Sequence, residues 1–244
     1  MIELYTWPTP NGQKVQILLE ELCLPYRVHA VNIGAGDQFD PDFLVFSPNN
    51  KIPAIVDPDG PEGEPLTLFE SGAILWYLAD KHGRFLPPDQ RARMEVLQWL
   101  MFQMGSLGPM LGQAHHFRIY APQRIDYAVE RYTREANRLY SVMDHRLAGS
   151  PWLGGGAYGI ADIAAYPWTV GYERQGVRIE DYPHVQRWQS RIGERPQVAA
   201  GMTVLAEEGK RTSLTDEKAR DVLFGESQYR RRVPGSRNDD TGAD

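Results

Sequence analysis

The sequence predicts two domains of different class, an α/β domain over residues 1–82 and an all-helical domain over residues 90–225. Up to about residue 82, short apolar runs alternate with a helical period and with turn residues. After the proline-rich residues 83–89, which we interpret as the linker, helical periods alone remain. The last segment, residues 226–244, lacks apolar periodicity, and we expect it to be disordered.

The first domain is predicted to contain strand, helix and strand, followed by a hairpin and a second helix. Residues 2–7 predict the first strand, apolar residues at i, i+3, i+4 and i+7 from Val15 predict a helix, and residues 26–30 alternate as the second strand. A hairpin over residues 54–69 and a helix from Ser71 complete the order βαβ-ββα. This order resembles the thioredoxin-like arrangement.

The composition limits the partners and the compartment. The 244 residues carry a formal net charge of −6, so we expect neither nucleic acid nor an anionic membrane as a partner, since both require a positive surface. No apolar run approaches the roughly 20 residues that span a membrane, and the first residues do not resemble a signal peptide, so the expected compartment is the cytoplasm. The single cysteine, Cys23, lies between two leucines, where we expect it to be a small buried residue.

A polar pair, Glu70 and Ser71, opens the helix that follows the hairpin. A helix N-terminus offers free N–H groups and the positive end of the helix dipole, so Ser71 is suited to bind a carboxylate while Glu70 pairs with an ammonium group beside it. Together they fit the head group of an amino acid. The alternative is that Ser71 only caps the helix and Glu70 only complements its dipole.

Four runs in order, Thr9–Gly12, Asn49–Ile55, Leu68–Ile74 and Gly108–Gln113, give the chain a family resemblance. With them the sequence resembles the glutathione transferases, in particular the Nu-class bacterial enzymes, which are relatives of the yeast nitrogen regulator that forms a prion. The resemblance extends from residue 1 to about residue 205. It implies the glutathione transferase fold, glutathione as co-substrate without a tightly bound cofactor, and a homodimer.

The resemblance also implies roles for single residues. It implies a cis bond between Ile52 and Pro53, so that the backbone of Ile52, next to Lys51, binds the extended peptide of glutathione as an added strand. It carries over Gln38, in a loop over the site, as a further glutathione ligand. It carries over Arg131 as a helix arginine that crosses the dimer interface to glutathione. The alternative for Gln38 and Arg131 is an ordinary solvated side chain.

The loop Thr9–Gly12 is the second place where chemistry is expected. In a thioredoxin-like fold this loop faces the cis-proline, and Thr9 and Asn11 supply a hydroxyl and an amide donor there. Neither side chain is a base at neutral pH, so the predicted role is to hydrogen-bond the glutathione sulfur and favour its thiolate. The alternative is an ordinary turn with Asn11 as the helix N-cap.

The expected function is that of a glutathione-dependent disulfide-bond oxidoreductase and transferase that acts on a small disulfide or electrophile without a protein cysteine. For the second substrate we predict a cleft lined by His116, Trp168 and Tyr172. The histidines here have poor spacing to other ligands, and no metal is expected. The alternative function is a non-catalytic regulatory or ligand-binding module on the same fold.

One position departs from the family pattern. Gly159 stands where transferases usually have Ser or Thr, which forms a capping box with the residue at Asp162. A Gly cap typically loses only a few tenths of a kcal/mol relative to a good cap, so the fold is not affected.

Overall fold

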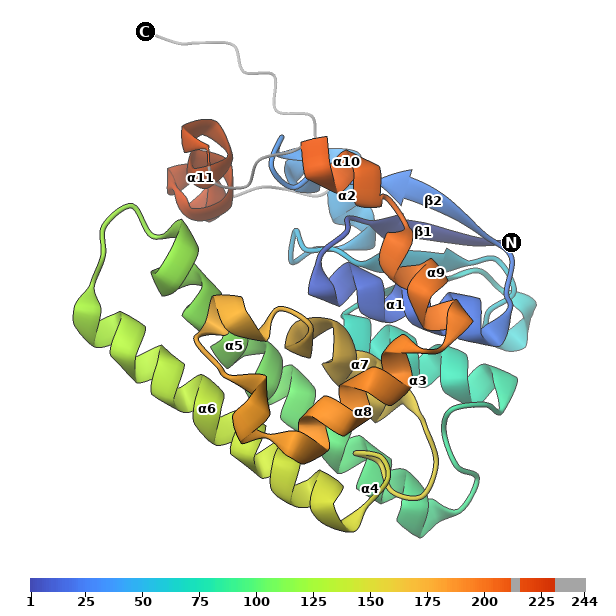
Figure 1. The fold of residues 1–244 in the computed structure, drawn as a ribbon. Helices are drawn as coiled ribbons and strands as arrows, with labels where there is room; N and C mark the ends of the chain where they lie inside the picture. The colour runs from blue at the N-terminus through green and yellow to red at the C-terminus, as the bar shows by residue number, and fades with distance from the viewer. Residues whose placement is uncertain (212–215, 231–244) are drawn as a thin grey trace, which may run out of the picture.

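The computed structural model describes residues 1–211 and 216–230, which form a small mixed-sheet domain followed by a helical domain (Figure 1). The predicted order βαβ-ββα is confirmed for the first domain, with short additional helices between its strands. The bounds of its elements are β1 Ile2–Thr6, α1 Pro10–Leu22, β2 Tyr26–Ala30, η1 Asp37–Phe39, α2 Pro41–Phe46, β3 Ala54–Asp57, η2 Pro61–Gly63, β4 Leu66–Phe69 and α3 Ser71–His82.

The sheet has the strand order β2-β1-β3-β4. Strands β1 and β2 run parallel, with Leu4 opposite Val28, while β3 runs antiparallel to both β1 and β4. The β1–β3 register sets Leu4 opposite Ile55, and both side chains are fully buried. The parallel pair β1–β2 requires the crossover through α1, whereas the antiparallel pair β3–β4 requires only a hairpin connection.

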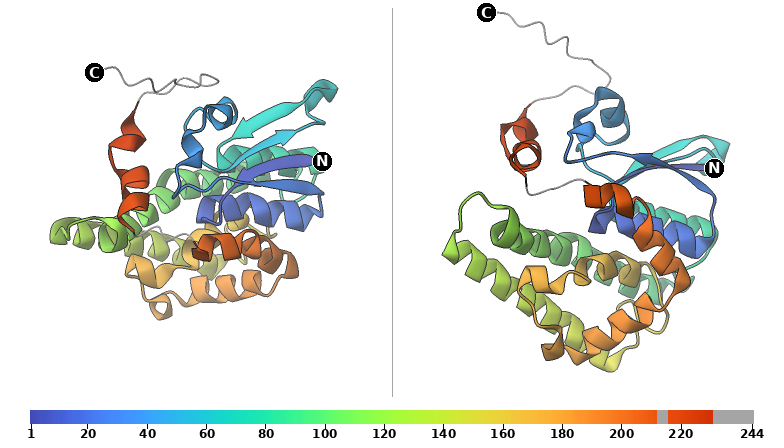
Figure 2. Two further views of the ribbon diagram at one scale, coloured as in Figure 1. Left: turned by 90° about the horizontal axis from the view of Figure 1, so that it is seen from above. Right: turned by 45° about the horizontal axis from the view of Figure 1, so that its top comes forward.

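Helix α1 lies between the sheet and the helical domain, in contact with α3, α7 and α9 (Figures 1 and 2). Its apolar side chains cover more than one face, because Val15, Ile17, Leu18 and Leu19 are all fully buried. A helix that is apolar on several sides is buried on several sides. The N-terminus of α1 therefore opens at the junction of the two domains.

The second domain is helical throughout. Two of its segments, η3 and η4, are π-helical and continue directly from the α-helices before them. The bounds are α4 Gln90–Phe102, η3 Gln103–Leu107, α5 Gly108–His115, η4 His116–Tyr120, α6 Asp126–Gly149, α7 Ile160–Thr169, η5 Tyr172–Gln175, η6 Ile179–Asp181, α8 Pro183–Gly193, α9 Pro196–Thr203, α10 Ala206–Arg211, α11 Glu217–Phe224 and η7 Glu226–Tyr229.

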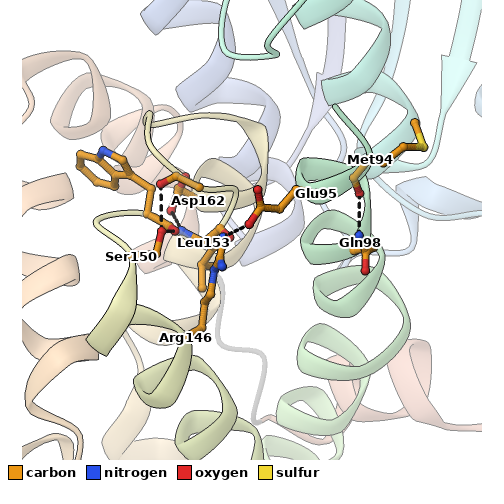
Figure 3. Close-up of polar contacts among 9 residues, drawn as sticks. Met94, Glu95, Gln98, Arg146, Ser150, Leu153 and Asp162 are labelled. Atoms are coloured by element: carbon orange, nitrogen blue, oxygen red, sulfur yellow. Dashed lines mark hydrogen bonds and ion pairs between the residues drawn. The ribbon is translucent and has the colours of Figure 1, made fainter. Parts of the chain in front are cut away.

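Asp162 organises the start of α7 from within the core. Its carboxylate is fully buried and accepts hydrogen bonds from Leu153 N and Trp188 Nε1, both at 2.8 Å, and from Gly159 N at 3.2 Å. Figure 3 shows this carboxylate beside Leu153. Burial raises the pKa of Asp162 to about 6, against the effect of these hydrogen bonds. The part of the capping box that the sequence assigns to Asp162 is therefore present.

The packing around the N-cap of α7 explains why this residue, Gly159, is a glycine. A Cβ atom on Gly159 would lie 2.7 Å from the carbonyl oxygen of Phe85, which itself accepts a hydrogen bond from Ile160 N at 3.0 Å. The backbone after α3 thus occupies the space that a Ser or Thr side chain would need. Gly159 allows this close approach of the linker to the helical domain.

Two features differ from the sequence predictions. Cys23 is exposed rather than buried, because it is the C-cap of α1 in the left-handed region, at φ 56°, and no longer follows the helical period. Within the segment predicted to be disordered, Glu226–Tyr229 forms the 3-10 helix η7, while the rest of that segment after residue 230 lies outside the described residues. Among the described residues, no helix has the length and apolar character needed to cross a membrane.

Candidate functional site

A cavity of about 360 Å³ lies where α1, α3, η3 and α5 meet. It gathers side chains from both domains and includes seven residues predicted from the sequence. The lining residues are Asn11, Lys14, Ser47, Asn49, Lys51, Ile52, Pro53, Phe69, Glu70, Ser71, Gln103, Met104, Gly108, Pro109, Gly112, Gln113 and Trp168.

The pair Glu70 and Ser71 lies in this cavity at the start of α3. The capping alternative requires Ser71 to be the N-cap, but Ser71 is the first residue of the helix. Glu70 holds the N-cap position and makes no side-chain cap hydrogen bond. Glu70 has φ 70°, in the left-handed region that a side chain rarely adopts. Such strain is characteristic of ligand sites, where surrounding packing fixes a conformation that the residue alone would avoid.

The hydroxyl of Ser71 contacts a buried ammonium group. Lys14, from the first turns of α1, donates to Ser71 Oγ at 3.2 Å, to Gln103 Oε1 at 2.7 Å and to Met104 Sδ at 3.4 Å. The Lys14 side chain is only 1% exposed, and burial lowers its pKa to about 7, while the charge of Glu70 opposes that shift. The site therefore contains a positive group that its own contacts leave without an anion.

The amide of Asn11 is oriented by a tryptophan of the other domain. Trp168 Nε1, on α7, donates to Asn11 Oδ1 at 2.9 Å. Because an indole N–H is only a donor, its partner must be the amide oxygen, and the NH₂ group of Asn11 remains available as a donor at the cavity. The N-cap of α1 is Thr9, without a side-chain cap hydrogen bond, so the alternative with Asn11 as N-cap is wrong.

Two glycines of α5 make room for the indole ring. A Cβ atom on Gly108 would lie 3.5 Å from Trp168 Nε1, and one on Gly112 would lie 3.4 Å from the far edge of the ring. Gly108 and Gly112 are one helical turn apart and therefore on the same face. Within the run Gly108–Gln113, these glycines form the surface on which Trp168 rests.

The bond between Ile52 and Pro53 is cis, as the resemblance implies. Ile52 and Asn11 line both the first cavity and a second cavity of about 220 Å³. The second cavity also includes Thr9 and Gln38, and it is closed on one side by Leu223 of α11. Both cavities meet at the N-terminus of α1, so Thr9 and Gln38 lie beside Asn11 but apart from Glu70 and Ser71.

The remaining predicted residues are placed differently. His116 packs edge-on against Phe224 of α11 at 4.7 Å between ring centroids, and neither His116 nor Tyr172 is among the described residues that line the two cavities. Arg131 is on the exposed surface of α6 and lines neither cavity. Of the residues predicted for the second substrate, the structure brings only Trp168 to the site.

Sequence reasoning missed Lys14, Gln103 and Met104. The signal for Lys14 was its position: a lysine on a helix whose neighbouring residues Val15 and Leu18 are apolar is unusual unless it has a buried partner. Gln103 and Met104 carry no such signal, because the π-helical turn that points them at the cavity depends on packing. Among the described residues, no group of three or more His, Cys, Asp and Glu side chains is placed to bind a metal ion.

Comparison with known proteins identifies the family. The model of the glutathione S-transferase N-terminal domain matches residues 9–81, and that of the C-terminal domain matches residues 107–196. The chain is 54% identical to the disulfide-bond oxidoreductase YfcG of Escherichia coli K12 over 220 residues, which are 90% of this chain and 99% of that protein. The chain belongs to the glutathione S-transferase family, and the resemblance seen in the sequence is confirmed.

Two solved structures extend this comparison. A glutathione transferase from Burkholderia graminis, solved with two glutathione molecules per subunit, is 47% identical and has a TM-score of 0.79, covering 83% of this chain and 87% of that one. A glutathione transferase from Pseudomonas putida, solved with one glutathione disulfide per subunit, is 46% identical and has a TM-score of 0.80, covering 83% of this chain and 91% of that one. Both relatives share the fold described here.

Proposed function

We propose that this protein is a glutathione-dependent disulfide-bond oxidoreductase that binds glutathione in the larger cavity. The observation that carries this proposal is the amide of Asn11, whose oxygen is occupied by Trp168 and whose NH₂ group is left at the N-terminus of α1. A thiolate at that place gains from the amide donor and from the positive end of the helix dipole. The family membership and the name of the relative YfcG support the same activity.

In this proposal glutathione extends across the cavity with its ends recognised separately. Glu70 and Ser71 bind the head group of the glutamyl residue, and Ile52, whose backbone makes no hydrogen bond to another described residue, pairs with the cysteinyl peptide as an added strand. Lys51 lies beside Ile52 at the same cavity. These contacts bring the glutathione sulfur to the N-terminus of α1, within reach of Asn11.

The reaction is thiol–disulfide exchange. The bound glutathione thiolate attacks one sulfur of a small disulfide, forms a mixed disulfide and releases the other half as a thiol. A second glutathione thiolate then attacks the mixed disulfide, so that two glutathione molecules become glutathione disulfide and the substrate becomes two thiols. Relatives solved with two glutathione molecules or with glutathione disulfide support this order of the two exchange steps. The second cavity, beside Thr9 and Gln38, gives room for the second reactant.

The proposal includes a homodimer in which Arg131 of one protomer reaches the glutathione of its partner. Arg131 supports it by position, since it is exposed on α6 and makes no ion pair with a described residue, whereas its neighbours Arg134 and Arg138 pair with glutamates of the same helix. Sedimentation analysis is expected to show a dimer, and Arg131→Ala is expected to raise the KM for glutathione with little change in the dimer. A monomeric wild-type protein would contradict this part.

Turnover tests the central assignment. Reduction of 2-hydroxyethyl disulfide by glutathione, coupled to glutathione reductase, is measured for wild type, Asn11→Ala and Thr9→Ala, with Thr203→Ala on the exposed surface of α9 as a control. Loss of one preorganised donor to a developing charge typically costs about 10²-fold in rate, so we expect a drop of that order for Asn11→Ala and a smaller one for Thr9→Ala. Tight glutathione binding without turnover in wild type would indicate a binding module instead.

A further inference from the structure

The ammonium group of Lys14 is enclosed by neutral acceptors. Its three hydrogen bonds go to the hydroxyl of Ser71, the amide oxygen of Gln103 and the thioether of Met104, and it forms no ion pair with a described residue. Removal of an ammonium group from water without an anion costs several kcal/mol, which neutral acceptors compensate only partly. A bound anion would supply the charge that these contacts lack.

The surroundings of Lys14 accept an anion on the cavity side. Because Lys14 donates to Ser71 Oγ, the hydroxyl hydrogen of Ser71 is left only a weak contact with Met104 Sδ at 3.7 Å. Gln103 Nε2 is fully buried in the cavity wall and has no partner among the described residues. Two donors, one of them polarised by Lys14, thus lack strong acceptors at the same end of the cavity.

We propose that Lys14 is the counter-charge for the glutamyl carboxylate of glutathione, acting through the hydroxyl of Ser71, and that glutathione binding fixes a proton on its amine. This inference rests on the proposed function. The glutamyl head group is a zwitterion, and its ammonium group pairs with Glu70, so its carboxylate is left for Ser71 and Lys14. Lys14 is in this account a positioning residue, because it acts on the ligand through Ser71.

The charged side chains around Lys14 do not supply the anion that its ammonium group lacks, so that anion is left to the ligand. Glu70 is the one acidic side chain among the described residues that lines the cavity, and Lys51 is the other cation there. Segment η3 contributes only neutral side chains, and the charged residues of α3 lie two or more turns from Ser71. On α7, Asp162 is held by its own donors, and at α9 the guanidinium of Arg195 pairs with Glu21.

The consequence is a pH dependence of binding whose sign follows from the amine. In the free protein, burial holds the pKa of Lys14 at about 7, and a bound carboxylate raises it. Binding is therefore strongest where the amine is already protonated, below pH 7, and weakens as the pH rises. If the carboxylate holds the bound amine protonated up to pH 8, the Kd rises roughly tenfold between pH 6 and pH 8, with close to one proton taken up per ligand at pH 8.

Calorimetric titration with S-methylglutathione tests this inference. The ligand has no free thiol, so proton release by a thiol does not contribute. Titrations of wild type and Lys14→Met at pH 6, 7 and 8, each in two buffers of different ionisation enthalpy, give the Kd and the number of protons exchanged. The amine of the ligand titrates in both proteins, so the difference between them reports Lys14. We expect roughly tenfold weaker binding for Lys14→Met at pH 6 and no Lys14-dependent proton uptake.

The outcomes separate this inference from the proposed function. The unliganded Lys14→Met protein is expected to be at least as stable to heat as wild type, because the substitution removes a buried charge. If it does not fold, the buffer dependence of the wild-type heat still decides the question, because the proposal requires close to one proton taken up per ligand at pH 8 and little uptake at pH 6. The role of Lys14 would be overturned if wild type bound the ligand without taking up a proton. It would also be overturned if wild type and Lys14→Met had the same Kd at every pH. Failure of wild type to bind the ligand at any pH would instead overturn the proposed function.

Discussion

At the scale of single residues, the proposed chemistry depends on the orientation of one side-chain amide. Asn11 can present either its oxygen or its NH₂ group to the ligand, and only the NH₂ group stabilises a thiolate. The indole N–H of Trp168 donates to the oxygen at 2.9 Å and so fixes the orientation that the proposed function requires. Burial holds the pKa of the neighbouring His115, stacked on Trp168, at about 4, so that ring adds no positive charge near neutral pH.

Trp168→Phe tests this orientation, because it removes the indole N–H and keeps an aromatic ring at this position. A hydrogen bond of this kind contributes about 1 kcal/mol, so we expect kcat/KM for disulfide reduction to fall roughly three- to tenfold with little change in thermal stability. Trp99→Phe is the matched control, because Trp99 lines neither cavity. Wild-type kcat/KM in the Trp168→Phe protein would show that the amide does not need this partner.

At the scale of elements, the junction between α3 and α7 explains a departure from the family pattern. The linker carbonyl of Phe85 lies where a side chain on Gly159 would be, and the same carbonyl accepts a hydrogen bond from Ile160. The carboxylate of Asp162 binds the N–H of Gly159 from the other side. The N-terminus of α7 is therefore fixed between the linker and the core without a capping hydroxyl.

Gly159→Ser, which supplies the usual capping hydroxyl, is accordingly expected to destabilise the protein. The gain from a better cap is a few tenths of a kcal/mol, whereas a Cβ atom at 2.7 Å from a backbone oxygen forces a shift that typically costs 1–3 kcal/mol. Urea unfolding measures the difference. Gly156→Ser is the control, since a Cβ atom there meets nothing within 4 Å and its effect is expected within about 0.5 kcal/mol. A more stable Gly159→Ser protein would be evidence against the clash.

The elements themselves are largely predictable from the sequence, while several contacts of the site are not. Strand alternation and helical periods depend on neighbouring residues, so the order βαβ-ββα is recovered. The roles of Lys14 depend on partners 57 and 89 residues away, which no local pattern reveals. Cys23 was expected to be buried because of its leucine neighbours, but the end of α1 changes its direction. The family motifs contain Asn11, Glu70 and Ser71, whereas the predicted second-substrate residues, Trp168 included, belong to no motif.

At the scale of the whole molecule, the site exists only because both domains surround α1. Asn11 and Lys14 come from the first turns of that helix, Ser71 from α3, and Gln103 and Trp168 from the helical domain. The buried faces of α1 hold it against the sheet and against α7 and α9 (Figure 1). A change at the domain junction is therefore expected to affect glutathione binding and thiolate stabilisation together.

The pKa of the thiol of bound glutathione tests the central claim most directly. A thiolate absorbs in the ultraviolet where a thiol does not, so titration of the complex, with the S-methylglutathione complex subtracted, gives this pKa. For wild type we predict a value at least about one unit below the usual thiol value of about 8.5, and for Asn11→Ala a value returned toward it. An unshifted pKa in wild type, or the same lowered pKa in Asn11→Ala, would contradict the account of this site.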